Sequence, residues 1–331
     1  MSKNNVIVNK WLSQKGRFAD LMNGCLFQGQ QIVLPDQLEK LDRETDLFIP
    51  DKLDRKQKKG RGIQRYRDVA MRWNNKAEFT ILAIENQERI HYAMPVRTMI
   101  YDGLSYAEQI EEAWKDEEKN KQNIASEEFL SHFRKTDRLY PVITLVFYYG
   151  SIPWDGSRDL YEMIFPKEID GSDAKIRKYI PNYAVNLVDV ERLEDTTVFQ
   201  TDLQYVLNMI KYREKKEKIL EYVEENKSYF QHMNVDSYRA LGVFLNSEKW
   251  LAENNIFERE GETDMCKALE EIFEDGKEKG IEEGIEKGID GKLKELISRK
   301  LQKGKDPETI AEELEDSVDT IRRLIQEMSA V

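Results

Sequence analysis

Apolar and polar residues alternate along the chain in patterns that predict a helix followed by strands. Between residues 11 and 28 apolar positions repeat every three or four residues, as on one face of a helix. Residues 45–50 have the pattern of a short strand ending at a proline, and two longer strands are predicted at 66–73 and 78–86. The connection 74–77 reads Asn-Asn-Lys-Ala, and asparagine tolerates positive φ. The last two strands are therefore predicted to form a hairpin.

A long helix and a buried strand are predicted after the hairpin. The helix runs from about 95 to 114, with Pro95 in its first turn, and a charged helical stretch continues to about 133. Residues 141–149 are almost continuously β-branched or aromatic, which is typical of a central strand buried on both faces. The order helix, three strands, helix, strand predicts an α/β fold, with a mixed sheet covered by helices. From 181 to about 260 the pattern is mainly helical.

The composition changes near residue 270. Glycine recurs at 276, 280, 284 and 288, and a compact helical segment follows. We therefore predict three parts: a main domain with a helical extension over 1–265, a glycine-repeat linker or helix over 266–291, and a small helical module over 292–331.

The tail is predicted to serve assembly. Each interior glycine costs a helix about 1 kcal/mol relative to alanine, so the repeat needs a partner helix unless it is a flexible linker. Three short helices after 292 suggest a helix-turn-helix, but residues 305–328 hold eight acidic side chains against three basic ones. We therefore favour an oligomerisation or protein-binding module over a DNA reader, and predict a homo-oligomer formed through the tail.

Composition limits the class of protein. The chain has 331 residues, 40% hydrophobic and 34% charged, with a net charge of −12. Its longest apolar run is far shorter than the roughly 20 residues that span a membrane, so no membrane partner is expected. Its two cysteines have no metal-ligand spacing, and a reduced, cytoplasmic location is the simplest interpretation.

Two acidic residues of the predicted hairpin carry the candidate chemistry. Asp68 stands at the start of the first strand and Glu85 near the end of the second, so hairpin pairing would bring them together at one end of the sheet. Two such carboxylates make the oxygen site that Mg²⁺ or Mn²⁺ prefers. Glu85 follows an apolar run in which an unpaired carboxylate is costly. Either a metal ion or an arginine partner would stabilise it, and the spacing leaves both open.

Asp68 followed by Glu85-Asn86-Gln87 resembles the PD-(D/E)XK nuclease motif, with glutamine in place of the usual lysine. The wider sequence resembles the Rpn family of recombination-promoting nucleases, often labelled putative transposases, over roughly residues 10 to 240. The matching stretches are residues 17–24, 67–69, 84–88, 91–97 and 140–156. The predicted element order is also that of the core of this superfamily.

The resemblance implies roles for individual residues. Asp68 and Glu85 would be metal ligands, with the backbone carbonyl of Asn86 as a third, and Gln87 would orient the attacking water. Glutamine is neutral and cannot supply the charge of the lysine that it replaces. Arg97, in the first turn of the next helix, is a candidate substitute or else forms an ordinary salt bridge. Asp20 on the first helix is either a further acidic group of the site or a solvent-facing residue.

A basic segment precedes Asp68 directly. Residues 52–67 hold eight basic side chains and one acidic one, a local charge of +7. Lysine and arginine contacts to phosphates supply most of the non-specific affinity for nucleic acid. We expect this segment to be a loop that binds DNA, although a solvated surface loop or a basic counterweight to an acidic partner would have the same composition. The residues singled out for DNA binding are Lys56, Lys58, Lys59, Arg61, Arg65 and Arg67.

The function that the resemblance implies is a divalent-metal-dependent endonuclease acting on DNA, linked to recombination, mobile elements or defence. The alternative is a catalytically weak or inactive relative that acts as a nucleic-acid-binding or assembly protein. Metal affinity separates the first possibility from the second, because only a working nuclease needs the ion.

Overall fold

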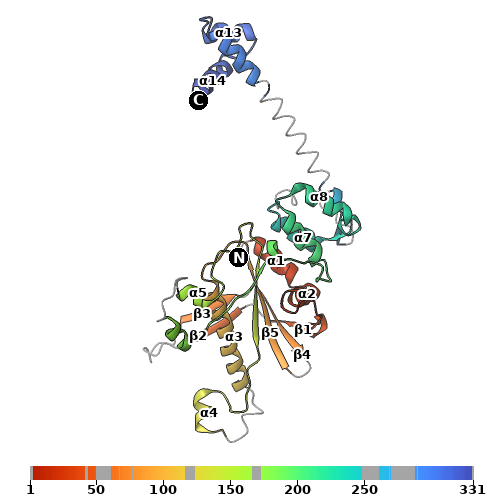
Figure 1. The fold of residues 1–331 in the computed structure, drawn as a ribbon, viewed down its shortest axis with the longest axis vertical. Helices are drawn as coiled ribbons and strands as arrows, with labels where there is room; N and C mark the ends of the chain where they lie inside the picture. The colour runs from red at the N-terminus through yellow and green to blue at the C-terminus, as the bar shows by residue number, and fades with distance from the viewer. Residues whose placement is uncertain are drawn as a thin grey trace. The chain divides into compact units, whose positions relative to one another are not determined.

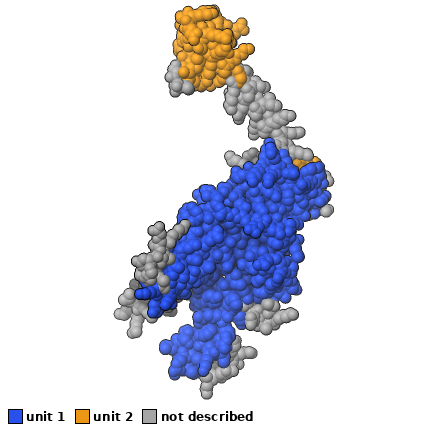
Figure 2. Space-filling view, viewed as in Figure 1, with its two compact units in different colours: residues 1–263 blue, residues 264–331 orange. Residues whose placement is uncertain are grey.

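The structure is a computed structural model in which the chain divides into two compact units, residues 1–263 and 264–331 (Figures 1 and 2). It describes residues 3–41, 44–49, 61–66, 68–75, 78–115, 124–165, 173–247, 261–267, 269, 288 and 290–329. Most of the glycine repeat therefore lies outside the described residues. Within the described part, no helix is both long and apolar enough to span a membrane.

A five-stranded mixed sheet forms the centre of the first unit (Figure 1). Its strands, in spatial order, are β1 (Leu38–Lys40), β4 (Val69–Asn75), β5 (Glu78–Gln87), β6 (Val142–Tyr148) and β7 (Asn186–Asp189). The first three pair antiparallel, whereas β5, β6 and β7 are parallel. The α/β class and the mixed sheet predicted from the sequence are confirmed.

The hairpin predicted around residues 74–77 is formed by β4 and β5. Its innermost described pair is Asn75 with Glu78, and the pairing continues outward to Val69 with Ile84. The apolar run of β6 is buried between β5 and β7, as its composition predicted. The strands β1 and β7, of three and four residues, were not predicted because such short strands carry little alternation.

A second hairpin corrects two sequence-based expectations. The strand expected at 45–50 is β2 (Glu44–Ile49), but it pairs with β3 (Arg61–Tyr66) in a separate two-stranded sheet. The antiparallel edge of the main sheet is instead β1. Residues 61–66 belong to a strand and not to a loop, because pairing with β2 outweighs their low intrinsic strand propensity.

Helices cover both faces of the sheet (Figure 1). Met94, at the start of α3 (Met94–Lys115), packs on Val146 and Tyr148 of β6. Phe147 points to the opposite face, because successive side chains of a strand alternate. There it meets Phe244 of α10 (Val235–Phe244), which also contacts Trp11 of α1 (Lys3–Leu12). Helix α3 confirms the helix expected from about 95 to 114.

The helix expected over 11–28 is mainly α2 (Lys15–Leu26), and residues 11–12 are the end of α1, whose first eight residues were not predicted to be helical. The backbone of Gln14 is extended, with φ −72° and ψ 125°, so the chain bends between them. The remaining elements of the first unit are η1 (Pro35–Gln37), α4 (Ser126–Ser131), α5 (Leu160–Ile164), α6 (Asp173–Ile176), η3 (Arg177–Tyr179), η4 (Val190–Arg192), α7 (Leu203–Tyr212), α8 (Lys216–Glu225), α9 (Lys227–Phe230), β8 (Met233–Asn234) and β9 (Glu262–Thr263).

The second unit contains the three helices expected from the sequence: residues 290–301, α13 (Pro307–Leu314) and α14 (Val318–Ser329). Asp306 caps α13 by accepting a hydrogen bond from the backbone N–H of Thr309, and Ser317 caps α14 in the same way through Thr320.

The apolar side chains of this small bundle pack against one another. Its core consists of Ile297, Ile310, Ala311, Ile321 and Leu324. Among its described residues, no large hydrophobic side chain is strongly exposed. The three short helices therefore bury their own leucines and isoleucines. Self-association through the tail stays a prediction that rests on the glycine repeat.

Candidate active site

The β4–β5 hairpin places Asp68 beside the end of β5. Val69 pairs with Ile84, so Asp68, one residue earlier, stands next to Glu85, one residue later. Both carboxylates are buried, Glu85 completely and Asp68 at 5% exposure. The sequence-based expectation that the hairpin would bring these two residues to one end of the sheet is therefore met by the register.

Hydrogen bonds fix the Asp68 carboxylate to the neighbouring strand and to a helix. The backbone N–H of Asn86 donates to Oδ2 of Asp68 at 2.9 Å, and Nδ2 of Asn9 donates to Oδ1 at 3.3 Å. The Asn9 and Asn86 side chains also bond to each other. The site thus joins α1, the residue that precedes β4 and the end of β5.

Asn9 was not predicted from the sequence. It is fully buried in α1, next to Val8 and close to Trp11, which are also fully buried. An asparagine on an otherwise apolar helix face needs hydrogen-bond partners, and this is the signal that could have revealed it. The first helix therefore does contribute a polar group to Asp68, but the group is the carboxamide of Asn9 and not a carboxylate.

Glu85 forms an ion pair with Arg97. The guanidinium Nη2 lies 3.2 Å from Oε2 of Glu85, and Arg97 is itself 31% exposed. Arg97 lies in the first turn of α3, and this turn packs on β6 beside β5. The ordinary salt bridge considered for Arg97 is present. The same contact places a positive charge at the Glu85 carboxylate.

A cavity of about 330 Å³ adjoins this ion pair, lined by His91, Ala93, Val96, Arg97, Ile100 and Tyr101. The pKa of His91 lies below its usual value, first because of burial and then because of the nearby Arg97 charge. His91 therefore takes up a proton less readily than a histidine in water. Arg97 is the cation that this cavity offers to an anionic ligand.

Gln87 is the last residue of β5 and is nearly buried, at 9% exposure. It pairs with Tyr148 in the parallel β5–β6 register, and the backbone N–H of Tyr149 donates to its carbonyl at 3.0 Å. It lies two positions after Glu85, so the two side chains extend from the same face of the strand. The carboxamide of Gln87 therefore projects from the same face as the Glu85 carboxylate.

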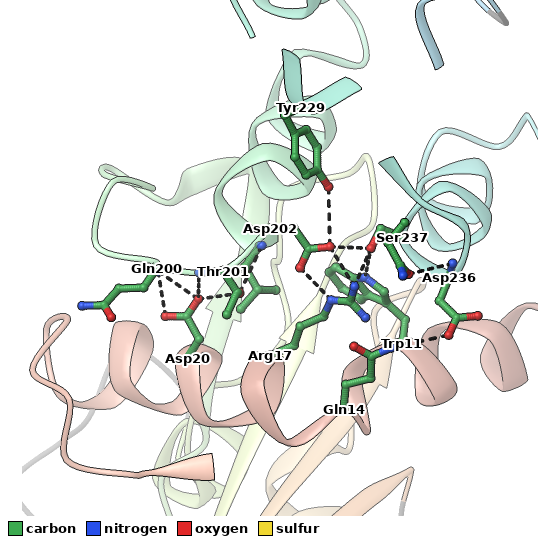
Figure 3. Close-up of polar contacts among 12 residues, drawn as sticks. Trp11, Gln14, Arg17, Asp20, Gln200, Thr201, Asp202, Tyr229, Asp236 and Ser237 are labelled. Carbon is green, nitrogen blue, oxygen red and sulfur yellow. Dashed lines mark hydrogen bonds and ion pairs between the residues drawn. The ribbon is translucent and has the colours of Figure 1, made fainter. Parts of the chain in front are cut away.

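Asp20 has a structural role. Its carboxylate accepts hydrogen bonds from the backbone N–H groups of Gln200 and Thr201 and from the Thr201 hydroxyl (Figure 3). These bonds hold the turn that leads into α7. Among the described residues no three acidic, histidine or cysteine side chains gather as a metal site, so Asp20 does not join Asp68 and Glu85 in one.

Arg17, on the same helix α2, is the centre of a buried network beside Asp20 (Figure 3). Its guanidinium binds both carboxylate oxygens of Asp202, at 2.6 and 2.8 Å, and donates to Ser237 at 2.7 Å. Trp11 of α1 donates to the same hydroxyl at 3.1 Å. The network therefore ties α1 and α2 to α10 and to the start of α7.

The basic segment is described only in part. Lys56, Lys58, Lys59 and Arg67 lie outside the described residues. Arg61 and Arg65 belong to β3, where their backbones pair with Ile49 and Thr45. Its proposed contact with nucleic acid therefore stays a prediction from charge and from the position of the segment before Asp68.

Comparison with known proteins gives one result. Residues 8–238 match the family model described as "Putative transposase, YhgA-like", which covers more than half of the chain, from α1 into α10. No curated protein and no solved structure matches. The matched region includes Asp68, Glu85 and the whole five-stranded sheet. The chain therefore belongs to the family of YhgA-like putative transposases.

Proposed function

We propose that the protein is a divalent-metal-dependent endonuclease that hydrolyses DNA phosphodiester bonds on a PD-(D/E)XK-like core. The observation that supports this most is the buried pair Asp68 and Glu85, adjacent through the β4–β5 register. The family, which is described as one of transposases, is consistent with work on the DNA of mobile elements.

The residue types present are those that bind a magnesium or manganese ion. Two carboxylates, the backbone carbonyl of Asn86 and the Gln87 carboxamide offer oxygen donors, and Mg²⁺ is commonly held by one or two carboxylates together with waters and substrate phosphates. A cluster of three acidic groups is therefore not required. When bound, such an ion would polarise a phosphoryl oxygen and lower the pKa of a water molecule.

The chain's own groups would perform the other tasks of hydrolysis. The Gln87 carboxamide would orient the attacking water by hydrogen bonding. The Arg97 guanidinium would stabilise negative charge that develops on the phosphate in the transition state. Asn9 would hold Asp68 in place, as partners behind metal ligands commonly do.

The test is a cleavage assay with purified full-length protein and supercoiled DNA. We expect nicked or linear product with Mg²⁺ or Mn²⁺ and none with a chelator. Equal cleavage with and without chelator would contradict a metal-dependent mechanism, and no cleavage under any condition would contradict the enzyme.

A second candidate is a nucleic-acid-binding relative without activity. The Arg97–Glu85 ion pair favours it, because a guanidinium can stabilise a buried carboxylate without a metal ion. Calorimetric titration with Mn²⁺ separates the two candidates. Binding that disappears in the Glu85→Gln variant supports the enzyme, and absence of binding supports the second candidate.

Gln87→Ala is expected to slow cleavage by about 10- to 100-fold, the usual effect of removing a group that supports metal ligands. We expect Gln87→Lys to cleave faster than the native protein, because an ammonium adds charge stabilisation that a carboxamide lacks. Single-turnover rates at saturating Mg²⁺ provide the comparison. A Gln87→Ala variant as active as the native chain would remove Gln87 from the site.

Replacing Lys56, Lys58, Lys59 and Arg61 with alanine is expected to weaken DNA binding equally for all sequences. Phosphate contacts carry no base information, and removing each basic side chain that binds a phosphate should flatten the salt dependence by roughly one unit of slope. The measurement is the Kd at several salt concentrations.

The control replaces Lys215, Lys216 and Lys218, which are exposed at the start of α8. An unchanged affinity and slope in the basic-segment variant would exclude this segment as the DNA-binding surface.

A further inference from the structure

A cavity of about 370 Å³ opens where β5 and β6 end. Its walls come from the turn after β5 (residues 88–92), the turn after β6 (residues 149–152) and the ends of α7 and α10. Pockets for small ligands usually measure about 300–1,000 Å³. The carboxyl ends of parallel strands are also where open α/β sheets bind ligands.

The cavity begins one residue beyond the candidate active site. Glu88, which lines it, follows Gln87 directly, and Tyr148, also in the lining, pairs with Gln87. The backbone N–H of Tyr149 bonds to the Gln87 carbonyl at 3.0 Å. A strand whose phosphate lies at Asp68 and Glu85 would therefore place its neighbouring nucleotide near this cavity.

The inner wall is aromatic and rigid. Tyr148, Tyr149 and Phe244 line it and are almost completely buried. Arg213 fixes the wall by donating to the Tyr149 carbonyl at 2.7 Å and pairing with Glu191 at 2.6 Å. Gly150 is packed so closely that a Cβ there would lie 2.5 Å from the Glu88 carbonyl oxygen. The cavity is therefore preformed.

The rest of the lining combines exposed apolar surface with charge. Tyr92 is 65% exposed and Ile152 66% exposed, although both have large apolar side chains. Arg89 stands three residues before Tyr92 in the same turn and is exposed. Asn246 adds a carboxamide that can both donate and accept hydrogen bonds. An aromatic ring, a cation and a carboxamide suit a planar heterocycle attached to a phosphate backbone.

We propose that this cavity holds an unstacked nucleobase of the DNA strand bound at Asp68 and Glu85, stacked on Tyr92. The proposal rests on the proposed function and specifies its substrate: a strand in which a base can leave the helix. Extracting a base from a perfect duplex costs a few kcal/mol, so single-stranded or mismatched DNA should bind more tightly than a fully paired duplex.

The test measures binding of full-length protein to a labelled single-stranded DNA oligonucleotide by fluorescence anisotropy, with chelator present so that no cleavage occurs. A second oligonucleotide of the same length contains only abasic units. Tyr92→Ala is expected to weaken binding of the first oligonucleotide by roughly 5- to 150-fold, the effect of losing one stacked base, and to leave the abasic strand unaffected. Tyr92→Phe, which keeps the ring, should bind normally.

Tyr179→Ala is the matched control, because Tyr179 is exposed at 87% and lies outside the cavity lining. If Tyr92→Ala binds the base-containing strand as tightly as the native protein, the proposal is wrong. Loss of affinity for both strands alike would also contradict it, because stacking requires a base. Failure of the proposed function would give a different result. The native protein would then bind the base-containing strand more tightly than the abasic strand, but it would not cleave DNA with Mg²⁺ or Mn²⁺.

Discussion

Asp68→Asn and Glu85→Gln are each expected to lower DNA cleavage by more than about 100-fold, because the loss of a metal ligand should exceed the 10- to 100-fold effect of losing a supporting group. Amide variants are preferable to alanine. Asp68 accepts a hydrogen bond from the Asn86 backbone, and Glu85 is paired with Arg97. Replacing either acidic residue with alanine would leave its partner without a hydrogen-bond acceptor, and this would lower the free energy of unfolding by about 1–3 kcal/mol.

The measurement is the initial rate of supercoiled DNA nicking at saturating Mg²⁺, with thermal unfolding as the check on folding. Asp20→Asn is the control, because Asp20 is a buried acidic residue that binds residues 200–201 and not the site. Its cleavage rate per folded molecule should match that of the native protein. If either amide variant cleaves at the native rate, the assignment of the site is wrong.

The second large effect is expected on stability. Arg17→Ala or Asp202→Ala should lower the free energy of unfolding of the first unit by about 3–5 kcal/mol, because each leaves the other charge buried without its partner. The side chains of Arg17 and Asp202 are 7% and 14% exposed. The hydroxyl of Tyr229 also lies at Asp202, and burial followed by the Asp202 charge raises the pKa of this tyrosine. Tyr229 therefore stays neutral and cannot replace Arg17.

Urea denaturation provides the measurement, and the ion pair between Lys10 and Asp236 provides the control. That pair is also short, at 2.9 Å, but the Lys10 side chain is 66% exposed. Lys10→Ala should therefore cost less than about 1 kcal/mol. The double variant Arg17→Met with Asp202→Leu should lose less stability than either alanine variant, since it leaves no buried charge. Equal losses from Arg17→Ala and Lys10→Ala would contradict the importance of the network.

The hairpin and its acidic pair could be predicted because they are local. A turn of two asparagines and two alternating strands fix a register, and the register alone brings Asp68 to Glu85. The helix break at Gln14 could not be predicted, because the apolar stripe continues on both sides of it. Strand β3 was missed because its stability comes from pairing with β2 and not from its own composition.

Contacts between distant parts of the chain account for what remained hidden at the site. Asn9 lies 59 positions before Asp68, and nothing in its neighbourhood in sequence indicates that partner. Asp20 has the residue type and the helix position expected of a further acidic group at the metal site, but its carboxylate binds a turn 180 positions away in the sequence. A carboxylate on a helix can serve a metal ion or a backbone turn, and only the three-dimensional arrangement distinguishes the two.

The dependence of the site on α10 has a consequence for synthesis of the protein. Helix α1 carries Asn9, and it is held by Phe244 and Ser237 of α10, more than 220 residues further along the chain. Chains grow from the N-terminus at a rate of about 5–20 residues per second. A nascent chain therefore holds Asp68 and Glu85 for many seconds before α10 emerges to position α1 behind them. Ribosome-bound and prematurely terminated chains should consequently lack an ordered site, so the cleavage of DNA proposed above would begin only after α10 has been synthesised.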